Sequence, residues 1–225
     1  MNVARQLALD LGLRPAVGRD DFLVAASNQE AVAIVDQWPN WPSYGAVISG
    51  PAGSGKSHLA TVWQQRTHAA IVNAKDLHIE TLPLLLRNKA LVVEDMDQGE
   101  LPERALFHAL NMIMQQSGTI LLTTKQLPQF AIKDLASRIS ALPQGHIKTA
   151  DDALLRGVLV KLFSDRQIAI DEALVSFMLT RMARSLESAR SLVAAIDQQA
   201  LEQGAEVTKL FVGRVMSQMQ NPELF

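Results

Sequence analysis

The chain has 225 residues, of which 48% are apolar and 20% charged, and its formal net charge at pH 7 is −2. This composition is typical of a soluble globular protein with ample material for a core. The charge balance excludes the generally basic surface of proteins that coat nucleic acid. The absence of cysteine excludes disulfides and cysteine-based zinc sites. Because neither a signal peptide nor an apolar run of about 18 residues is visible, we expect a cytoplasmic protein with no membrane span.

Residues 1–20 are expected to form an arm outside the core, because glycine and proline recur in them and interrupt any helix. If the segment is extended, Leu7, Leu9 and Leu11 lie on one side of it. The pattern leaves two alternatives open. The leucines dock into an apolar groove of a partner, or the arm is a terminal strand that covers its own domain.

A helix is predicted next, over residues 27–38. Ser27, with Glu30 three residues later, has the spacing of a capping box in which the serine is the N-cap. Pro39 ends this helix. The short apolar run at 46–49 then predicts a buried strand.

Residues 50–57, Gly-Pro-Ala-Gly-Ser-Gly-Lys-Ser, match the phosphate-binding P-loop. They lie between that strand and a predicted helix, because the apolar residues of 58–67 have helical spacing. The glycines let the backbone curl so that successive N–H groups point at one anion. The positive end of the helix dipole faces the same place. Lys56 is predicted to reach the β- and γ-phosphates, and the Ser57 hydroxyl to hold magnesium. We therefore expect a site for ADP or ATP with Mg²⁺.

Strands alternate with helices in the middle of the chain, which predicts an α/β fold with a parallel sheet flanked on both faces. Further strands are expected at 69–73, 90–93 and 119–124, with helices at 76–87, broken at Pro83, and at 102–116. From Asp151 the pattern is helical only, with apolar stripes at 151–165, 171–184, 185–203 and 208–220. This part has ten acidic and eight basic residues, so it is a poor candidate for a DNA-binding domain.

Glu94 and Asp95 directly follow the third strand, where P-loop ATPases place the acidic residue that holds magnesium. The usual order there is Asp then Glu, and this chain has the reverse. Glu94, in the magnesium position, is one methylene too long, and Asp95, in the water-activating position, is one too short. A shift on the order of 1 Å at such a position can cost roughly a hundredfold in rate. The sequence therefore supports nucleotide binding better than fast turnover.

Two arginines are candidates for phosphate contacts. Arg138 follows the fourth strand, and an arginine offered to a neighbouring subunit's γ-phosphate can raise hydrolysis by roughly 10³–10⁵. Arg184 could instead reach the nucleotide held by its own chain. For both, the alternative is an ordinary solvated surface charge.

These pieces together resemble the AAA+ domain of the DnaA replication-initiator family, over residues 21 to about 220. The matching segments are Phe22-Leu-Val24 with Ser27-Asn28, the P-loop with His58-Leu59, Glu94-Asp95, the sensor-1 strand end Leu-Leu-Thr-Thr124, the arginine-finger segment Leu135-Ala-Ser-Arg138 and the sensor-2 segment Arg184-Ser-Leu-Glu187. The resemblance implies a five-stranded parallel-sheet AAA+ base over 21–149, with 146–148 as its fifth strand. A smaller all-α lid over 150–225 would follow.

Two departures from the initiator pattern shape the expected function. We expect the chain to lack the family's C-terminal DNA-binding domain, and with it direct sequence-specific DNA binding. The stretch Gln6–Leu11 is similar to the motif by which proteins bind the replicative sliding clamp. This pairing is similar to the regulatory inactivators of the DnaA family. It implies the clamp, the DnaA initiator and a second copy of the chain (a dimer) as partners, with Arg138 acting in trans. Lys125, where the initiator usually has an acidic or small polar residue, further disfavours intrinsic hydrolysis.

The expected site residues fall into four groups. Nucleotide contacts are expected from Leu23, Val24, Pro51, Ala52, Gly53, Ser54, Gly55, Lys56, Ser57, His58 and Arg184. Magnesium is expected at Ser57 and Glu94, catalytic roles at Arg138 and Asp95, and clamp contacts at Gln6, Leu7, Leu9 and Leu11.

Two other functions remain possible. An ATP-driven loader of the helicase-loader or transposition-helper type would hydrolyse ATP itself and bind single-stranded DNA. It needs a basic, aromatic groove that is not evident at this net charge. A small-molecule P-loop kinase needs an arginine-rich substrate lid, whereas the C-terminal helices are mixed in charge.

Overall fold

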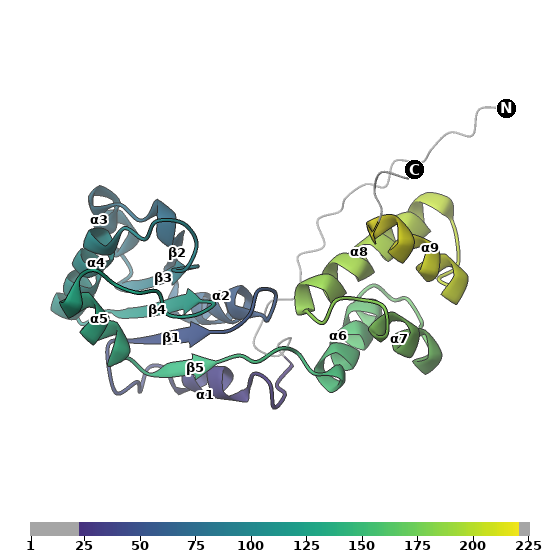
Figure 1. Ribbon diagram of the computed structural model, residues 1–225, viewed down its shortest axis with the longest axis horizontal. Helices are drawn as coiled ribbons and strands as arrows, with labels where there is room; N and C mark the ends of the chain where they lie inside the picture. The colour runs from purple at the N-terminus through teal and green to yellow at the C-terminus, as the bar shows by residue number, and fades with distance from the viewer. Residues whose placement is uncertain (1–22, 221–225) are drawn as a thin grey trace. The chain divides into compact units, whose positions relative to one another are not determined.

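The computed structural model describes residues 23–220 (Figure 1). The described chain divides into two compact units, one ending at Thr149 and one beginning at Ala150. The arm with its expected clamp-binding residues lies outside the described residues.

The first unit is built on a five-stranded sheet, as predicted, in the order β2-β3-β4-β1-β5. Every neighbouring pair in it is parallel. The strands are β1 (Gly45–Ser49), β2 (Ala70–Asn73), β3 (Ala90–Glu94), β4 (Thr119–Thr124) and β5 (Gln144–His146). Because all strands run the same way, their carboxyl ends meet at one edge of the sheet, and the loops that follow them lie together there.

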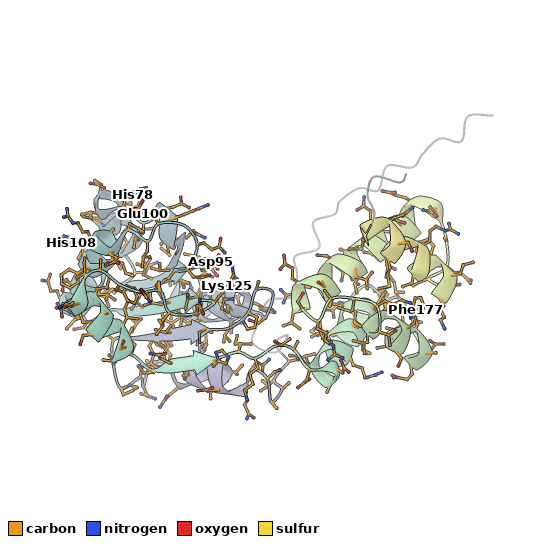
Figure 2. The ribbon with its side chains drawn as sticks, viewed as in Figure 1. His78, Asp95, Glu100, His108, Lys125 and Phe177 are labelled. Carbon is orange, nitrogen blue, oxygen red and sulfur yellow. The ribbon has the colours of Figure 1, made fainter. Side chains whose placement is uncertain are left out.

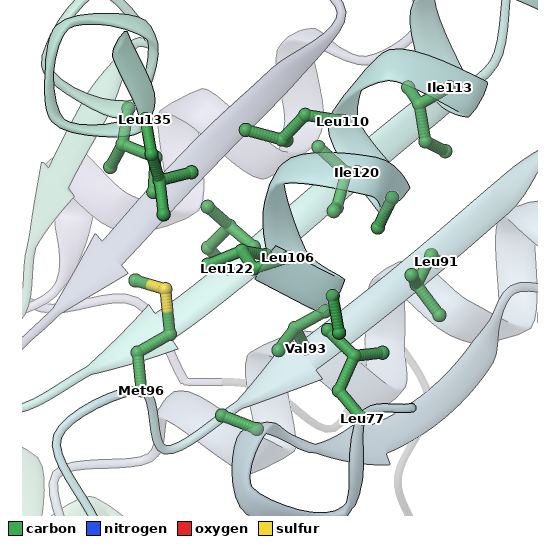
Figure 3. Packing of buried hydrophobic residues seen from close by; sticks show 14 of the residues in the cluster. Leu77, Leu91, Val93, Met96, Leu106, Leu110, Ile113, Ile120, Leu122 and Leu135 are labelled. Carbon is green, nitrogen blue, oxygen red and sulfur yellow. The ribbon is translucent and has the colours of Figure 1, made fainter. Parts of the chain in front are cut away.

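Helices cover both faces of this sheet. One face carries α1 (Gln29–Gln37) and α2 (Lys56–Thr67), and the other carries α3 (Leu82–Leu85), α4 (Glu103–Gln115) and α5 (Lys133–Ser140). Side chains of a strand alternate between faces, so Ala46 and Ile48 pack under the first pair of helices and Val47 under the others. Figure 3 shows the cluster of buried residues between the sheet and helices α3, α4 and α5. In it, Leu106 and Leu110 of α4 lie on the buried strand residues.

Two sequence predictions for this unit are wrong in detail. No long helix forms over 76–87: two 3-10 turns, η2 (Ala74–Asp76) and η3 (Ile79–Thr81), precede the four-residue α3. Pro83 lies in the first turn of α3, the place where a helix tolerates its missing N–H. The fifth strand is Gln144–His146 instead of 146–148.

The predicted capping box at the start of α1 is also wrong. The N-cap is Asn28, which makes no side-chain capping bond, and the buried Ser27 hydroxyl finds no partner. The Asn28 side chain turns back instead, accepting from the Ala25 N–H at 2.9 Å and donating to the Leu23 carbonyl at 2.9 Å. Asn28 therefore stabilises the turn that precedes the helix.

The second unit contains the four expected helices: α6 (Asp152–Ser164), α7 (Glu172–Leu179), α8 (Leu186–Gln203) and α9 (Lys209–Gln220). Asp151, Asp171 and Ser185 cap the first three through side-chain hydrogen bonds. Helix α7 ends five residues earlier than predicted. Phe163, Val193 and Val212 lie in the common core of this unit. Within the described residues, no helix is long and apolar enough to cross a membrane.

Candidate nucleotide-binding site

The P-loop follows β1, which lies inside the sheet between β4 and β5. Gly53 and Gly55 have φ values of 67° and 106°, in the left-handed region that favours glycine. Helix α2 then begins at Lys56 without a side-chain cap. The N–H groups of its first turn have no partner within the helix, so this loop and helix end have the form of an anion-binding site.

Lys56 is buried at the centre of this loop. Its ammonium donates to the carbonyl oxygens of Gly50 and Pro51 at 2.8 and 2.9 Å. Burial lowers its pKa, while the charges of Asp95 and Asp97 act in the opposite direction. The ammonium is therefore held inside the loop, where a phosphate would give it an anionic partner.

The remaining predicted P-loop residues differ in their exposure. Pro51, Ala52 and Ser57 are exposed, and Ser54 is buried with no partner for its hydroxyl. His58 is half-buried in the first turn of α2. The exposed Ser57 hydroxyl is thus open to a metal ion, as its predicted role requires.

The segment that carries Leu23 and Val24 is tied to the P-loop strand through Ile147 and Lys148. The Lys148 N–H donates to the Ser27 carbonyl at 2.8 Å, and the Ile147 N–H donates to the Ser49 carbonyl at 2.7 Å. Ile147, buried, was not among the predicted site residues. Its only signal in the sequence is its place within the predicted fifth strand, 146–148. Val24 is 51% exposed and offers an unpacked apolar side chain.

Glu94 ends β3, and one of its carboxylate oxygens is buried without a hydrogen-bond partner. An orphaned buried acceptor costs free energy, and a magnesium-bound water would satisfy it. Magnesium in P-loop sites is held by a hydroxyl, a carboxylate, phosphates and water. Glu94 and Ser57 are the residues predicted to supply the two protein groups of such a set. The described residues contain no cluster of three acidic or histidine ligands, and this kind of site does not need one.

Asp95 adopts a left-handed backbone conformation with φ of 57°. Its N–H donates to the Thr123 hydroxyl at 3.2 Å, and its carboxylate accepts a 3.4 Å bond from the Asn73 amide. Asn73, the last residue of β2, was not predicted to take part. A water-activating role for Asp95 stays a prediction.

Asp97 and Lys125 form a second polar group at this edge, and Figure 2 shows Asp95 and Lys125 at the same end of the sheet. Asp97 accepts from the Lys125 N–H at 2.7 Å and from the Thr124 hydroxyl at 3.0 Å. Partial burial raises the pKa of Asp97, but these hydrogen bonds outweigh burial and hold its pKa below the ordinary value. Asp97 therefore anchors the end of β4 as a carboxylate.

Arg138 lies at the opposite edge of the sheet, on α5. Its guanidinium donates to Asn111 at 2.7 Å, pairs with Asp134 at 3.0 Å and lies 4.8 Å from the centre of the Phe107 ring. Burial raises the pKa of Tyr44, and the nearby charge of Arg138 opposes part of this rise. Tyr44 precedes β1, whereas the P-loop follows it, and the five residues of β1 span about 16 Å. The structure does not bring Arg138 to the P-loop of its own chain.

Arg184 belongs to the second unit, where it pairs with Asp152 at 3.1 Å and is largely exposed. It immediately precedes Ser185, the N-cap of α8. Its contact with a nucleotide stays a prediction.

No protein-family model and no curated protein matches the chain. Solved structures match its fold. Domain III of the Thermotoga maritima replication initiation protein DnaA has a TM-score of 0.75 at 15% identity, covering 92% of this chain and 98% of that one. A replication initiator DnaA bound to AMPPCP and single-stranded DNA has a TM-score of 0.65 at 17% identity, covering 86% and 69%. Thermotoga maritima RuvB, a Holliday junction branch migration motor, has a TM-score of 0.65 at 16% identity, covering 84% and 68%.

At these identities the likeness establishes the fold and not the activity. The chain has an AAA+ fold, with a five-stranded parallel-sheet base and a smaller all-α unit, like DnaA domain III and RuvB.

Proposed function

We propose that this chain is a nucleotide-binding AAA+ regulator of the Hda type, a regulatory inactivator of the DnaA initiator. The P-loop holds ADP or ATP with magnesium. Gln6, Leu7, Leu9 and Leu11 bind the replicative sliding clamp. Arg138 stimulates hydrolysis of ATP held by DnaA, so that the protein acts as a negative regulator of replication initiation. The likeness to DnaA domain III supports this proposal, as does the AMPPCP bound to a similar DnaA.

The nucleotide of this chain has a binding role in the proposal. Lys56 and the first turn of α2 hold its phosphates, and Ser57 and Glu94 orient the metal. Bound magnesium neutralises charge on the β- and γ-phosphates. The Asp95 carboxylate already accepts a bond from the Asn73 amide, and it is shorter than the usual glutamate. Both features favour slow intrinsic turnover.

The location of Arg138 is the observation that carries the proposal. An arginine on the edge opposite its own P-loop cannot neutralise charge on its own nucleotide, but it can be offered to the site of a neighbour. There it would act mainly in the transition state, on charge that develops at the γ-phosphate. Its contacts with Asn111 and Phe107 hold the guanidinium in place before the partner arrives, which lowers the entropy cost of docking.

The test follows conversion of DnaA-bound ATP to ADP in the presence of clamp-loaded DNA. Arg138→Ala should lower the stimulated rate at least a hundredfold, a conservative share of the ~10³–10⁵ attributed to such arginines. Arg138→Lys should restore little, because an ammonium lacks the planar fork of donors. Arg87→Ala, which removes an exposed arginine elsewhere on the base, is the matched control and should keep the full rate.

Folding must be checked separately, because Arg138 makes intramolecular contacts. Losing one hydrogen bond, one ion pair and one ring contact is expected to cost on the order of 1–2 kcal/mol. Thermal melting will show whether Arg138→Ala remains folded at the assay temperature. Equal stimulated rates for the wild type, Arg138→Ala and Arg138→Lys would remove the trans-acting arginine from the proposal.

A further inference from the structure

A cavity of about 1190 Å³ lies wholly within the first unit, away from the P-loop. Three segments form its walls: residues 77–80 after β2, residues 96–105 between β3 and α4, and residues 126–132 between β4 and α5. Figure 2 labels His78 and Glu100, which belong to two of these walls. The cavity has room for several side chains of a ligand, because drug-sized ligands occupy pockets of about 300–1,000 Å³.

The walls of the cavity are joined by hydrogen bonds within the chain. One carboxylate oxygen of Glu103 accepts from the Ala131 N–H at 2.8 Å, and the other accepts from the Ile132 N–H at 2.7 Å. These bonds connect the start of α4 to the segment between β4 and α5. The Met96 N–H donates to the Thr123 carbonyl at 3.0 Å, which fixes the segment after β3 beside β4. The cavity is therefore formed before a ligand arrives, and this lowers the entropy cost of binding.

The lining of the cavity is partly apolar. Leu77, Met96 and Ala105 line it and are buried. Ile79 and Leu127 line two different walls and are 42% and 36% exposed. Apolar side chains that stay exposed beside a cavity are typical of binding surfaces. A ligand with apolar side chains would cover them.

The charged side chains of the lining are mainly acidic. Four carboxylates, of Glu80, Asp97, Glu100 and Glu103, stand against the one guanidinium of Arg104. Asp97 and Glu103 already accept bonds from N–H groups of the chain. Glu80 and Glu100 are exposed, and neither carboxylate has a hydrogen bond or ion pair with another described residue. Two carboxylates on different walls thus remain for the cations of a ligand.

We propose that this cavity docks a partner protein through an apolar segment that carries basic side chains. Apolar side chains of the segment cover Ile79 and Leu127, and its arginines or lysines pair with Glu80 and Glu100. The acidic lining repels the phosphates of a nucleic acid. The exposed walls suit a chain segment better than a small molecule, which needs a site that encloses most of its surface. This inference goes beyond the proposed function and does not depend on it.

Fluorescence anisotropy on the full chain tests the inference with three labelled peptides. The first is Leu-Arg-Ala-Leu-Arg-Leu, and the other two have glutamine or glutamate in place of both arginines. The arginine peptide should bind most tightly and the glutamate peptide most weakly. Glu80→Gln combined with Glu100→Gln should weaken the arginine peptide about five- to twentyfold, the loss expected for two exposed ion pairs, and leave the glutamine peptide within about twofold. Ile79→Ser should weaken both of these peptides, a loss that charge alone does not produce.

The matched control is Glu30→Gln combined with Asp36→Asn, which makes the same change of net charge at exposed residues of α1, on the other face of the sheet. A loss in this control as large as in the cavity variant would reduce the effect to net charge and overturn the inference. Equal affinities for the arginine and glutamate peptides would overturn it too, and so would no binding of the arginine peptide up to about 1 mM.

A nucleic acid is the alternative occupant, and an oligothymidylate is its probe. Tighter binding of the oligothymidylate than of the arginine peptide, weakened by Ile79→Ser, would assign the cavity to nucleic acid and overturn the inference. Thermal melting of each variant confirms that it is folded. None of these measurements needs a nucleotide in the P-loop, so a negative result here leaves the proposed function untouched.

Discussion

Gly145 lies where β5 packs against α1, and replacing it with alanine tests that packing. A Cβ at this position would lie 2.7 Å from the Cα of Ala31, where ordinary contact begins at 3.4 Å. It would also lie 3.0 and 3.1 Å from the terminal carbons of Ile48 and Ile34. The isoleucines can rotate, but Ala31 Cα is helix backbone. Helix α1 must therefore move away by about 0.7 Å, the difference between the two distances, in a core that is close-packed.

Overpacking of this kind costs about 1–3 kcal/mol. Part of that cost is offset, because alanine loses about 0.5–1 kcal/mol less backbone entropy than glycine on folding. The expected net destabilisation of Gly145→Ala is about 0–2.5 kcal/mol, which lowers the melting temperature by up to roughly 10 °C for a chain of this size.

Thermal and urea denaturation measure this change. Gly213→Ala is the matched control: it lies within α9, its Cβ would meet only Phe177 at an ordinary 3.5 Å, and it should stabilise by about 0.5–1 kcal/mol. If Gly145→Ala were stabilised as much as Gly213→Ala, α1 would not lie on β5 as described.

Three further predictions concern the site and the arm. Lys56→Ala should abolish tight binding of both ADP and ATP, because it removes the cation buried in the loop, and wild-type affinity by calorimetry would refute the P-loop assignment. Asp97→Asn should destabilise the protein at pH 7, and the destabilisation should shrink as the pH falls below 3.8: a carboxylate with a lowered pKa stabilises fully above its unfolded value of 3.8, and this contribution is lost as pH falls through the folded pKa. Gln6→Ala combined with Leu11→Ala should abolish binding to the sliding clamp in a pull-down while leaving the melting temperature nearly unchanged; a drop of several degrees would favour the alternative of a terminal strand within the core.

The sheet could be predicted from the sequence because its strands are short apolar runs bounded by polar residues. The strand predicted at 119–124 has the observed bounds. The region 76–87 could not be predicted in the same way. The spacing of its apolar residues fits a helix, but Leu77 and Leu82 are both fully buried in the same core cluster as the leucines of α4. In addition, a helix tolerates Pro83 only in its first turn. Packing therefore overrode local propensity, and two 3-10 turns formed.

The candidate site shows the same division between local and long-range information. The P-loop is one continuous segment, so its sequence alone predicts its chemistry. The bonds of Asn73 to Asp95 and of Asp97 to Lys125 join residues 22 and 28 positions apart. They exist because the strand order places β3 between β2 and β4, and no spacing pattern in the sequence indicates that order. The capping box failed for a more local reason, because Asn28 competes with Ser27 and bonds back to Leu23 and Ala25.

Two proposed tasks, binding of the chain's own nucleotide and the action of Arg138 on a partner's nucleotide, lie at opposite edges of the parallel sheet, one strand length apart. At the carboxyl edge lie Lys56 and Glu94, which are proposed to hold the phosphates and the metal of this chain's own nucleotide. At the amino edge, Arg138 is held against α4 by Asn111. A group at one edge cannot neutralise charge at the other, because Coulomb energy between them is small and screened over such a distance. A trans-acting role for Arg138 therefore predicts that variants at the two edges have separable effects: those at the carboxyl edge alter nucleotide affinity, and those at the amino edge alter only the partner's hydrolysis. If Arg138→Ala changed the chain's own nucleotide affinity as strongly as Lys56→Ala does, this separation would be wrong.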